Sequence, residues 1–323
     1  MNLTPKRDFK VFFAMMGTLI IPAALTLFRV ERPGTLVIPA DPTPLGYTWS
    51  LLLFIIPILT IVAWLYINHD EKFIRKSFWL TIGLLTPIGF LLDILLGSTF
   101  FTFLNHNATL QIYLPGYNFS ARAWLWNLPV EEFIFYGTGF IAILLFYIWC
   151  DEYWLLAYNV PDYRSETKDI KRILVFHPWS VVLGIFLIII AVIYKKFFPH
   201  PYHEGFPGYF TFLVAVSITP SCAFFKTSSR FINWRAFSFT FFFLLLISLM
   251  WEATLATPYQ WWGYNYKQML GITVGAWSRL PIEAVMLWMS VTFTTVIIYE
   301  VIKIWFNSGK KAMEAFFGIR TKI

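Results

Sequence analysis

The sequence predicts an all-α polytopic integral membrane protein with about eight transmembrane helices in two similar four-helix halves. Of its 323 residues, 58% are hydrophobic, 20% are aromatic and only 13% are charged. A water-soluble domain carries roughly 25% charged residues. Lys and Arg also gather in alternate loops, and one acidic motif occurs once in each half. These three observations together predict the fold class.

Eight apolar segments define the expected spans. They lie, with uncertain ends, at residues 11–29, 48–67, 78–98, 128–149, 177–195, 207–224, 236–256 and 281–304. The first follows Lys6, Arg7 and Lys10 without a small-residue cleavage site, so we expect a retained span and not a signal peptide. The expected organisation is a first repeat over 1–150, a polar linker over 151–176, a second repeat over 177–306 and a tail over 307–323.

The charge distribution predicts the orientation. With the N-terminus in the cytoplasm, the inner segments hold 18 Lys and Arg residues and the outer segments hold 7. This asymmetry predicts cytoplasmic N- and C-termini in the cell (inner) membrane. It also accounts for the net charge of +7 without a nucleic-acid partner. The two cysteines, Cys150 and Cys222, are too few for a disulfide framework.

An acidic motif opens the last span of each half. Leu128-Pro129-Val130-Glu131-Glu132 precedes one apolar run, and Leu280-Pro281-Ile282-Glu283 recurs 152 positions later. Proline suits the first helical turn, where its missing N–H is not needed. The free N–H groups of that turn favour the glutamate anion, whereas burial favours the neutral acid. Such a carboxyl is suited to donating and accepting a proton.

Each half holds a further acid at the exit of its third span, namely Asp93 and Glu252. An acid within an apolar span costs about 2.5–3.5 kcal/mol on insertion scales, so these residues are functional candidates. The alternative is that each glutamate is an ordinary helix-start residue and that Asp93 faces the lipid headgroups. Recurrence at matching places in the two halves favours function over capping.

The two long outer loops are rich in aromatic residues. The first contains Phe100, Phe101, Phe103, Tyr113, Tyr117, Phe119, Trp124 and Trp126, and the second contains Tyr259, Trp261, Trp262, Tyr264, Tyr266 and Trp277. An interfacial aromatic belt explains most of them. The alternative is a cavity whose π faces stabilise a carbocation beside the acids. The five histidines form no metal-ligand pattern and no nucleotide or flavin motif occurs, so we expect neither a metal nor a cofactor.

These motifs resemble the membrane-embedded, non-flavin lycopene cyclase domain family of the fused two-domain type. The resemblance covers residues 78–150 and 236–304. It is carried by Asp93, Tyr113, Tyr117 and Pro129-Val130-Glu131-Glu132-Phe133-Ile134-Phe135-Tyr136 in the first half, and by Trp251-Glu252, Trp261-Trp262-Gly263-Tyr264, Gly271-Ile272 and Pro281-Ile282-Glu283 in the second. The second motif departs from the pattern because Ala284 stands where the first has Glu132.

The resemblance implies a cofactor-free, redox-neutral cyclase (an isomerase of carotenoid biosynthesis) that protonates the end of a linear polyene. It implies Glu131 and Glu283 as the acid/base pair, with Glu132, Asp93 and Glu252 tuning or sharing the proton. The expected partners are a polyene or isoprenoid from the lipid phase and membrane lipids, and a homo-oligomer or an association with other carotenoid enzymes stays open. Two alternatives remain: a cyclase or hydratase of another isoprenoid, and a non-enzymatic carotenoid-binding or transport protein.

Overall fold

The computed structural model describes residues 9–29, 37–38, 43–68, 73–159, 163–198, 200–274 and 278–319. Within these ranges, seven helices are long and apolar enough to cross a membrane: Gly46–Ile67, Arg75–Phe100, Val130–Trp154, Pro178–Phe197, Gly208–Ser228, Trp234–Ala256 and Ile282–Ser308. The segment expected as the first span contains a shorter apolar helix, Lys10–Thr26. The structure therefore supports the prediction of a multi-pass membrane protein.

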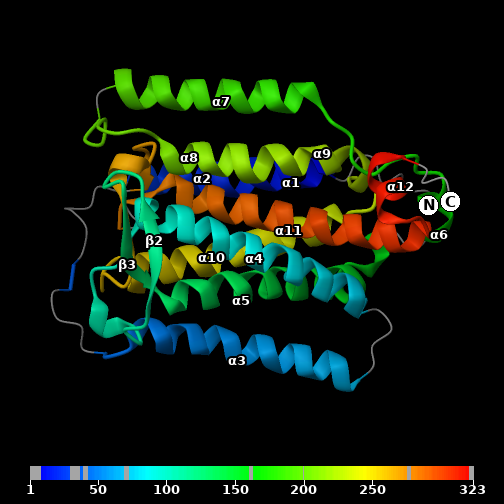
Figure 1. Ribbon diagram of the computed structural model, residues 1–323, viewed down its shortest axis with the longest axis horizontal. Coiled ribbons are helices and arrows are strands. Elements are labelled where there is room, and N and C mark those ends of the chain that lie inside the picture. Colours follow the sequence, from blue (N-terminus) through cyan, green and yellow to red (C-terminus); the bar gives the residue numbers. More distant parts are fainter. Residues whose placement is uncertain are drawn as a thin grey trace.

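All of these helices lie in one bundle (Figure 1). The helices are α1 (Phe9–Met15), α2 (Ile21–Arg29), α3 (Gly46–Ile67), α4 (Arg75–Phe100), α5 (Val130–Trp149), α6 (Tyr163–Lys168), α7 (Pro178–Phe197), α8 (Gly208–Phe212), α9 (Thr219–Ser228), α10 (Trp234–Trp251), α11 (Ile282–Ser308) and α12 (Ala312–Phe317). Four π-helical turns continue them: Met16–Ile20, Cys150–Trp154, Leu213–Ile218 and Glu252–Ala256. The last of these turns carries one of the predicted acids.

Helices α4, α5, α10 and α11 form the centre of the bundle, and α3 and α7 lie at its two edges (Figure 1). In the apolar stretch of α11, 56% of the residues are buried, against 17% in α3 and in α7. Large apolar side chains on the edge helices face outward, such as Leu53 and Trp179, which are 75% and 80% exposed. A surface of this kind is costly in water and is matched by lipid chains.

Short antiparallel strand pairs, which the sequence did not predict, order the loops at one end of the bundle. β1 (Phe101–Thr102) pairs with β4 (Gly263–Tyr264), β2 (Tyr113–Asn118) pairs with β3 (Ala123–Pro129), and β5 (Thr273–Val274) pairs with β6 (Leu280–Pro281). In register, Tyr113 lies opposite Pro129 and Thr273 lies opposite Pro281. Each of the two proline motifs is therefore the end of a hairpin that leads into a central helix.

The two long loops exchange equivalent hydrogen bonds. The Asn105 amide donates to Gln260 O over 3.1 Å, and the Asn265 amide donates to Phe100 O over 2.8 Å. The two asparagine side chains repeat this exchange, because Asn105 Nδ2 donates to Tyr259 O and Asn265 Nδ2 donates to Thr99 O. Within each of these pairs the equivalent residues are 160 positions apart. The two loops therefore make equivalent hydrogen bonds to one another.

The polar linker and the tail meet at the opposite end, where α6 and α12 lie (Figure 1). Ile173 N donates to Ala315 O over 2.8 Å, and Lys310 Nζ donates to Ile170 O over 2.6 Å. Between α6 and α12 the chain passes through four membrane-length helices, namely α7, the α8–α9 segment, α10 and α11, and so returns to the same end. Residues 160–162 of the predicted linker, 320–323 of the predicted tail and the aromatic Trp277 lie outside the described residues.

Candidate active site

The two proline motifs have the same local structure. Pro129 precedes α5 with φ −68° and ψ 146°, and Pro281 precedes α11 with φ −68° and ψ 150°. The next amide donates back to its own loop in both cases, from Val130 to Ile112 O and from Ile282 to Ile272 O, each over 2.9 Å. Because proline holds φ near this value, the chain turns into each helix in the same way. This geometry places Glu131 and Glu132 in the first turn of α5 and Glu283, which matches Glu131, in the first turn of α11.

Those matched glutamates, Glu131 and Glu283, hold the loops in place. Glu131 Oε1 accepts from Leu110 N over 2.7 Å, and Glu283 Oε1 accepts from Leu270 N over 2.5 Å. Glu131 also accepts from Thr48 Oγ1 over 2.5 Å. Both glutamates are fully buried. A carboxylate that accepts a backbone N–H makes one of the stronger hydrogen bonds, so each of them fixes its loop against its helix.

A different pair of carboxyls shares a cavity of about 30 Å³ at the centre of this end. Glu132 reaches it from α5, and Glu252 reaches it from the π-helical turn after α10. The other lining residues are aromatic or apolar: Tyr47, Phe101, Phe135, Tyr136, Trp262, Tyr264 and Leu287. Both carboxyls are buried, with 7% and 4% of their residue surfaces exposed. The cavity thus combines two acids from separate helical segments with an aromatic wall.

Each carboxyl of the cavity is held by a tyrosine. Tyr47 Oη donates to Glu132 Oε1 over 2.8 Å. Tyr264 Oη donates to Glu252 Oε2, and Ser248 Oγ donates to Glu252 Oε1 over 3.1 Å. Burial raises the pKa of Tyr264 well above its usual value, and the adjacent Glu252 raises it further. Tyr264 therefore keeps its proton and acts as a donor throughout the physiological range.

The aromatic residues of the loops divide into two groups. Trp262 packs against Tyr47 at a ring-centroid distance of 4.9 Å and against Trp251 at 4.7 Å, which builds one wall of the cavity. On the β2–β3 hairpin, by contrast, Trp124 and Trp126 are 56% and 71% exposed. Burial thus favours a cavity role for the second loop and an interfacial role for this hairpin.

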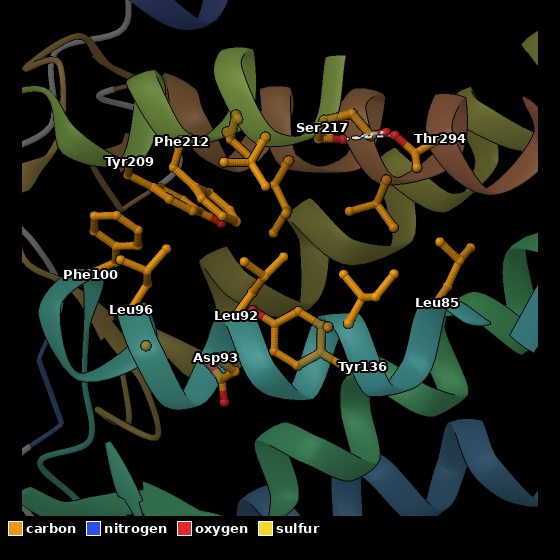
Figure 2. A pocket seen from close by; sticks show the side chains of 18 of the residues that line it. Leu85, Leu92, Asp93, Leu96, Phe100, Tyr136, Tyr209, Phe212, Ser217 and Thr294 are labelled. Atoms are coloured by element: carbon orange, nitrogen blue, oxygen red, sulfur yellow. Dashed lines mark hydrogen bonds between the residues drawn. The ribbon is translucent and has the colours of Figure 1, made fainter. Parts of the chain in front are cut away.

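Asp93 lies in a second pocket, of about 130 Å³, between α4, α8 and α11. Figure 2 shows Tyr209 and Phe212 on one wall and Asp93 and Tyr136 on the other. Only 3% of Asp93 is exposed, and neither of its carboxyl oxygens has a hydrogen-bond partner within the described part of the chain. Tyr136 and Leu287 line both this pocket and the central cavity. Asp93 is therefore adjacent to the Glu132–Glu252 cavity but is not part of it.

Sequence reasoning missed a buried polar cluster at the linker end. Lys303 Nζ lies 3.2 Å from Glu300 Oε1, and the two side chains are 3% and 0% exposed. Tyr147 Oη donates to the same Glu300 oxygen over 3.1 Å, and Asn233 Nδ2 donates to Asp151 Oδ1 over 2.9 Å. The available signal was an acid and a base three residues apart inside the expected last span. The pairing of these groups points to a structural role.

Comparisons of this chain with protein-family models, with curated proteins and with solved structures found no match.

Proposed function

We propose that this protein is an intramembrane cyclase of a linear polyene, of the carotenoid type, built from two similar four-span halves and related to the non-flavin lycopene cyclases that its motifs resemble. One observation carries the proposal. Glu132 and Glu252, from two separate halves, share one buried cavity with aromatic walls. Acid-initiated ring closure needs an acid, a base, a surface that stabilises a cation and the exclusion of water, and the two carboxyls and aromatic wall of this cavity support the first three.

The reaction conserves atoms and electrons. A carboxylic acid of the cavity adds its proton to the terminal C=C bond of the polyene, which forms a tertiary carbocation. An internal C=C bond attacks that carbon and closes the ring, and a carboxylate then removes a neighbouring proton to form the new double bond. The π faces of residues such as Tyr47 and Trp262 stabilise the cation. The reaction needs no oxidant or reductant, because the proton gained equals the proton lost.

The contacts of the glutamates favour a division of roles that differs from the one the resemblance implies. Glu132 and Glu252 line the cavity and act as the acid/base pair. Glu131 and Glu283 accept the Leu110 and Leu270 amides and position the loops that close the cavity. The single acid of the second motif then causes no difficulty, because the second carboxyl of the pair comes from the preceding helix and not from position 284.

The apolar chain of the substrate has a route from the lipid. Phe135 lines both the central cavity and a groove of about 70 Å³ between α3, α5 and α10. That groove shares Phe54, Ile58 and Ala142 with a larger one of about 530 Å³, which extends to Trp149. Phe135 and Trp149 are 14 residues apart on α5, or about 21 Å along its axis. A long linear chain in this groove would have one end beside Phe135, which separates the groove from the cavity with the acids.

The orientation completes the proposal. The charge asymmetry of the loops supports an orientation with the linker and the tail in the cytoplasm and with the carboxyl-bearing end of the bundle on the outer side of the cell membrane. The reacting end of the polyene would then lie near the outer interface, with the remainder of its chain along α5 toward the cytoplasmic side.

The decisive experiment expresses the chain in cells that make lycopene and nothing further, followed by pigment analysis. The wild type is expected to give cyclic products, and Glu132→Gln is expected to insert normally and to give none. Oxygen from labelled water in the product would indicate a hydratase instead. Purified protein that holds lycopene unaltered for hours would indicate a binding protein. Cyclic product from Glu132→Gln at the wild-type level would overturn the assignment of Glu132.

A further inference from the structure

The Asp93 pocket and the groove beside Glu252 are copies of one another. The helices that line them repeat at constant spacings: 159 positions from α4 to α10, 152 from α5 to α11 and 162 from α3 to the α8–α9 segment. At these spacings Leu92 corresponds to Trp251, Val216 to Phe54, and Thr294 to Ala142, and all six residues line their own pocket. Asp93 corresponds to Glu252 at the spacing of 159. In the loops the spacing is 160, and the π-helical turn Glu252–Ala256 accounts for the additional residue.

The two copies differ in how their polar groups are satisfied. Glu252 accepts hydrogen bonds from Tyr264 and Ser248. The counterparts of these donors around Asp93 are Leu104 and Gly89, neither of which has a hydroxyl group. Tyr47 donates to Glu132, whereas its counterpart Tyr209 would need an acid at position 284, which is alanine. The Asp93 pocket therefore has the polar groups Asp93 and Tyr209 but lacks the residues that bond to their counterparts in the other copy.

Both groups are consequently unsatisfied in a largely apolar pocket. Asp93 and Tyr209 are 3% and 1% exposed. The Asp93 oxygens and the Tyr209 hydroxyl have no hydrogen-bond partner within the described residues, although both side chains line the pocket. A buried polar group without a partner is costly, so a partner supplied by a ligand is strongly favoured. Ser217 and Thr294, farther along the same pocket, already bond to one another over 2.8 Å (Figure 2).

We propose that the Asp93 pocket is a second ligand site, which binds the hydroxyl end of a linear isoprenoid. A hydroxyl group donates one hydrogen bond and accepts others, so it can supply the missing partner of the Asp93 carboxyl or of the Tyr209 hydroxyl. The rest of the lining, which includes Leu92 and Val216, matches an apolar chain that enters from the lipid. The proposal concerns binding alone and does not require that Glu132 and Glu252 catalyse ring closure.

The test compares two radiolabelled probes on the purified full-length protein in lipid nanodiscs: geranylgeraniol, and the hydrocarbon of the same chain without the hydroxyl. The wild type is expected to bind the alcohol about tenfold more tightly, which corresponds to one additional net hydrogen bond. Tyr209→Phe and Asp93→Leu remove the two partners and are expected to abolish this preference. Their thermal unfolding shows whether each variant is folded.

A volume variant tests the position of the site. Val216→Phe introduces the residue that the other copy carries at Phe54, and it is expected to weaken the binding of both probes. Val182→Phe is the matched control, because Val182 lies on the outer face of α7 with 52% of its surface exposed and lines neither pocket. Equal affinity of the wild type for the two probes would overturn the proposal. So would an alcohol preference that persists in folded Tyr209→Phe and Asp93→Leu.

Failure of this proposal can be told apart from failure of the proposed function. Loss of alcohol preference is measured without turnover, whereas the pigment assay on Glu132→Gln reports ring closure alone. A wild type that cyclises lycopene but does not distinguish the two probes would reject only the second site. A wild type that prefers the alcohol but leaves lycopene unaltered would reject only the cyclase.

Discussion

Tyr47 donates a hydrogen bond of 2.8 Å to Glu132, whereas its counterpart Tyr209 stands against Ala284 in sequence register and has no partner within the described chain. The two equivalent tyrosines thus differ in their hydrogen bonding. In one copy a tyrosine orients a carboxyl that faces a shared cavity. In the other copy, neither the hydroxyl of Tyr209 nor the carboxyl of Asp93 has a hydrogen-bond partner within the described residues. For the tyrosines, the difference arises from an acid that is present at position 132 and absent from position 284. For Asp93 it arises from Leu104 and Gly89, which stand where Glu252 has Tyr264 and Ser248.

The adjacent glutamates 131 and 132 are expected to respond differently to the same substitution. Glu132→Gln retains an acceptor for Tyr47 but removes the acid, so cyclic product should disappear while stability changes little. Glu131→Gln retains an acceptor for Leu110 N, so part of the activity should remain. Glu131→Ala removes that acceptor and should cost about 1.5–3 kcal/mol of stability. Pigment analysis and thermal unfolding in detergent measure both effects, and equal loss of product in the two glutamine variants would contradict this division of roles.

Tyr264 provides a prediction about pH. Burial and Glu252 raise its pKa above the unfolded value of about 10. A raised folded pKa contributes stability that is fully present below the unfolded pKa and is lost as pH rises through the folded one. The melting temperature of the wild type should therefore fall, relative to Tyr264→Phe, from about pH 10 upward. Melting temperatures of the two proteins that change equally between about pH 7 and pH 11 would rule this out.

Phe135 is expected to control the access of water to the cavity, because it separates the cavity from the membrane-facing groove. Phe135→Leu should enlarge the opening and divert part of the cation to a hydroxylated product. Mass spectrometry of pigments formed in labelled water detects that product. Phe146→Leu, which alters only the outer groove, is the matched control and should give none. A Phe135→Leu variant whose products carry no label would show that other residues exclude the water.

The Glu300–Lys303 pair should matter for stability and not for chemistry, since it lies at the end of the bundle opposite the carboxyls. Lys303→Met removes the cation that pairs with the buried Glu300 carboxylate and should cost about 3–5 kcal/mol of stability. The double variant Glu300→Leu/Lys303→Met should recover most of that loss, because apolar residues of similar volume replace a buried pair at little cost. Thermal unfolding of the single and double variants measures the recovery, and additive losses would contradict it.

The sequence by itself determined the membrane class, the positions of the long helices and the recurrence of the Pro-x-Glu motif. Each of these follows from local physics: the length of the apolar runs, the cost of burying charge and the backbone preference of proline. The short strands between the helices escaped this reasoning. The β1–β4 pair joins two loops that are about 160 positions apart, and no local pattern reports such a contact, whereas β2–β3 and β5–β6 are short hairpins within one loop.

Only the tertiary structure decided which acids line the shared cavity and which accept hydrogen bonds from a loop. Adjacent glutamates on a helix point about 100° apart, so one of Glu131 and Glu132 had to face away from any shared cavity. The packing of α3 and α10 against α5 directs Glu132 inward and leaves Glu131 to the loop. The sequence also could not show that Asp93 and Tyr209 lack hydrogen-bond partners within the described residues. A missing hydrogen-bond partner is a property of the neighbours in space, which the order of residues along the chain does not contain.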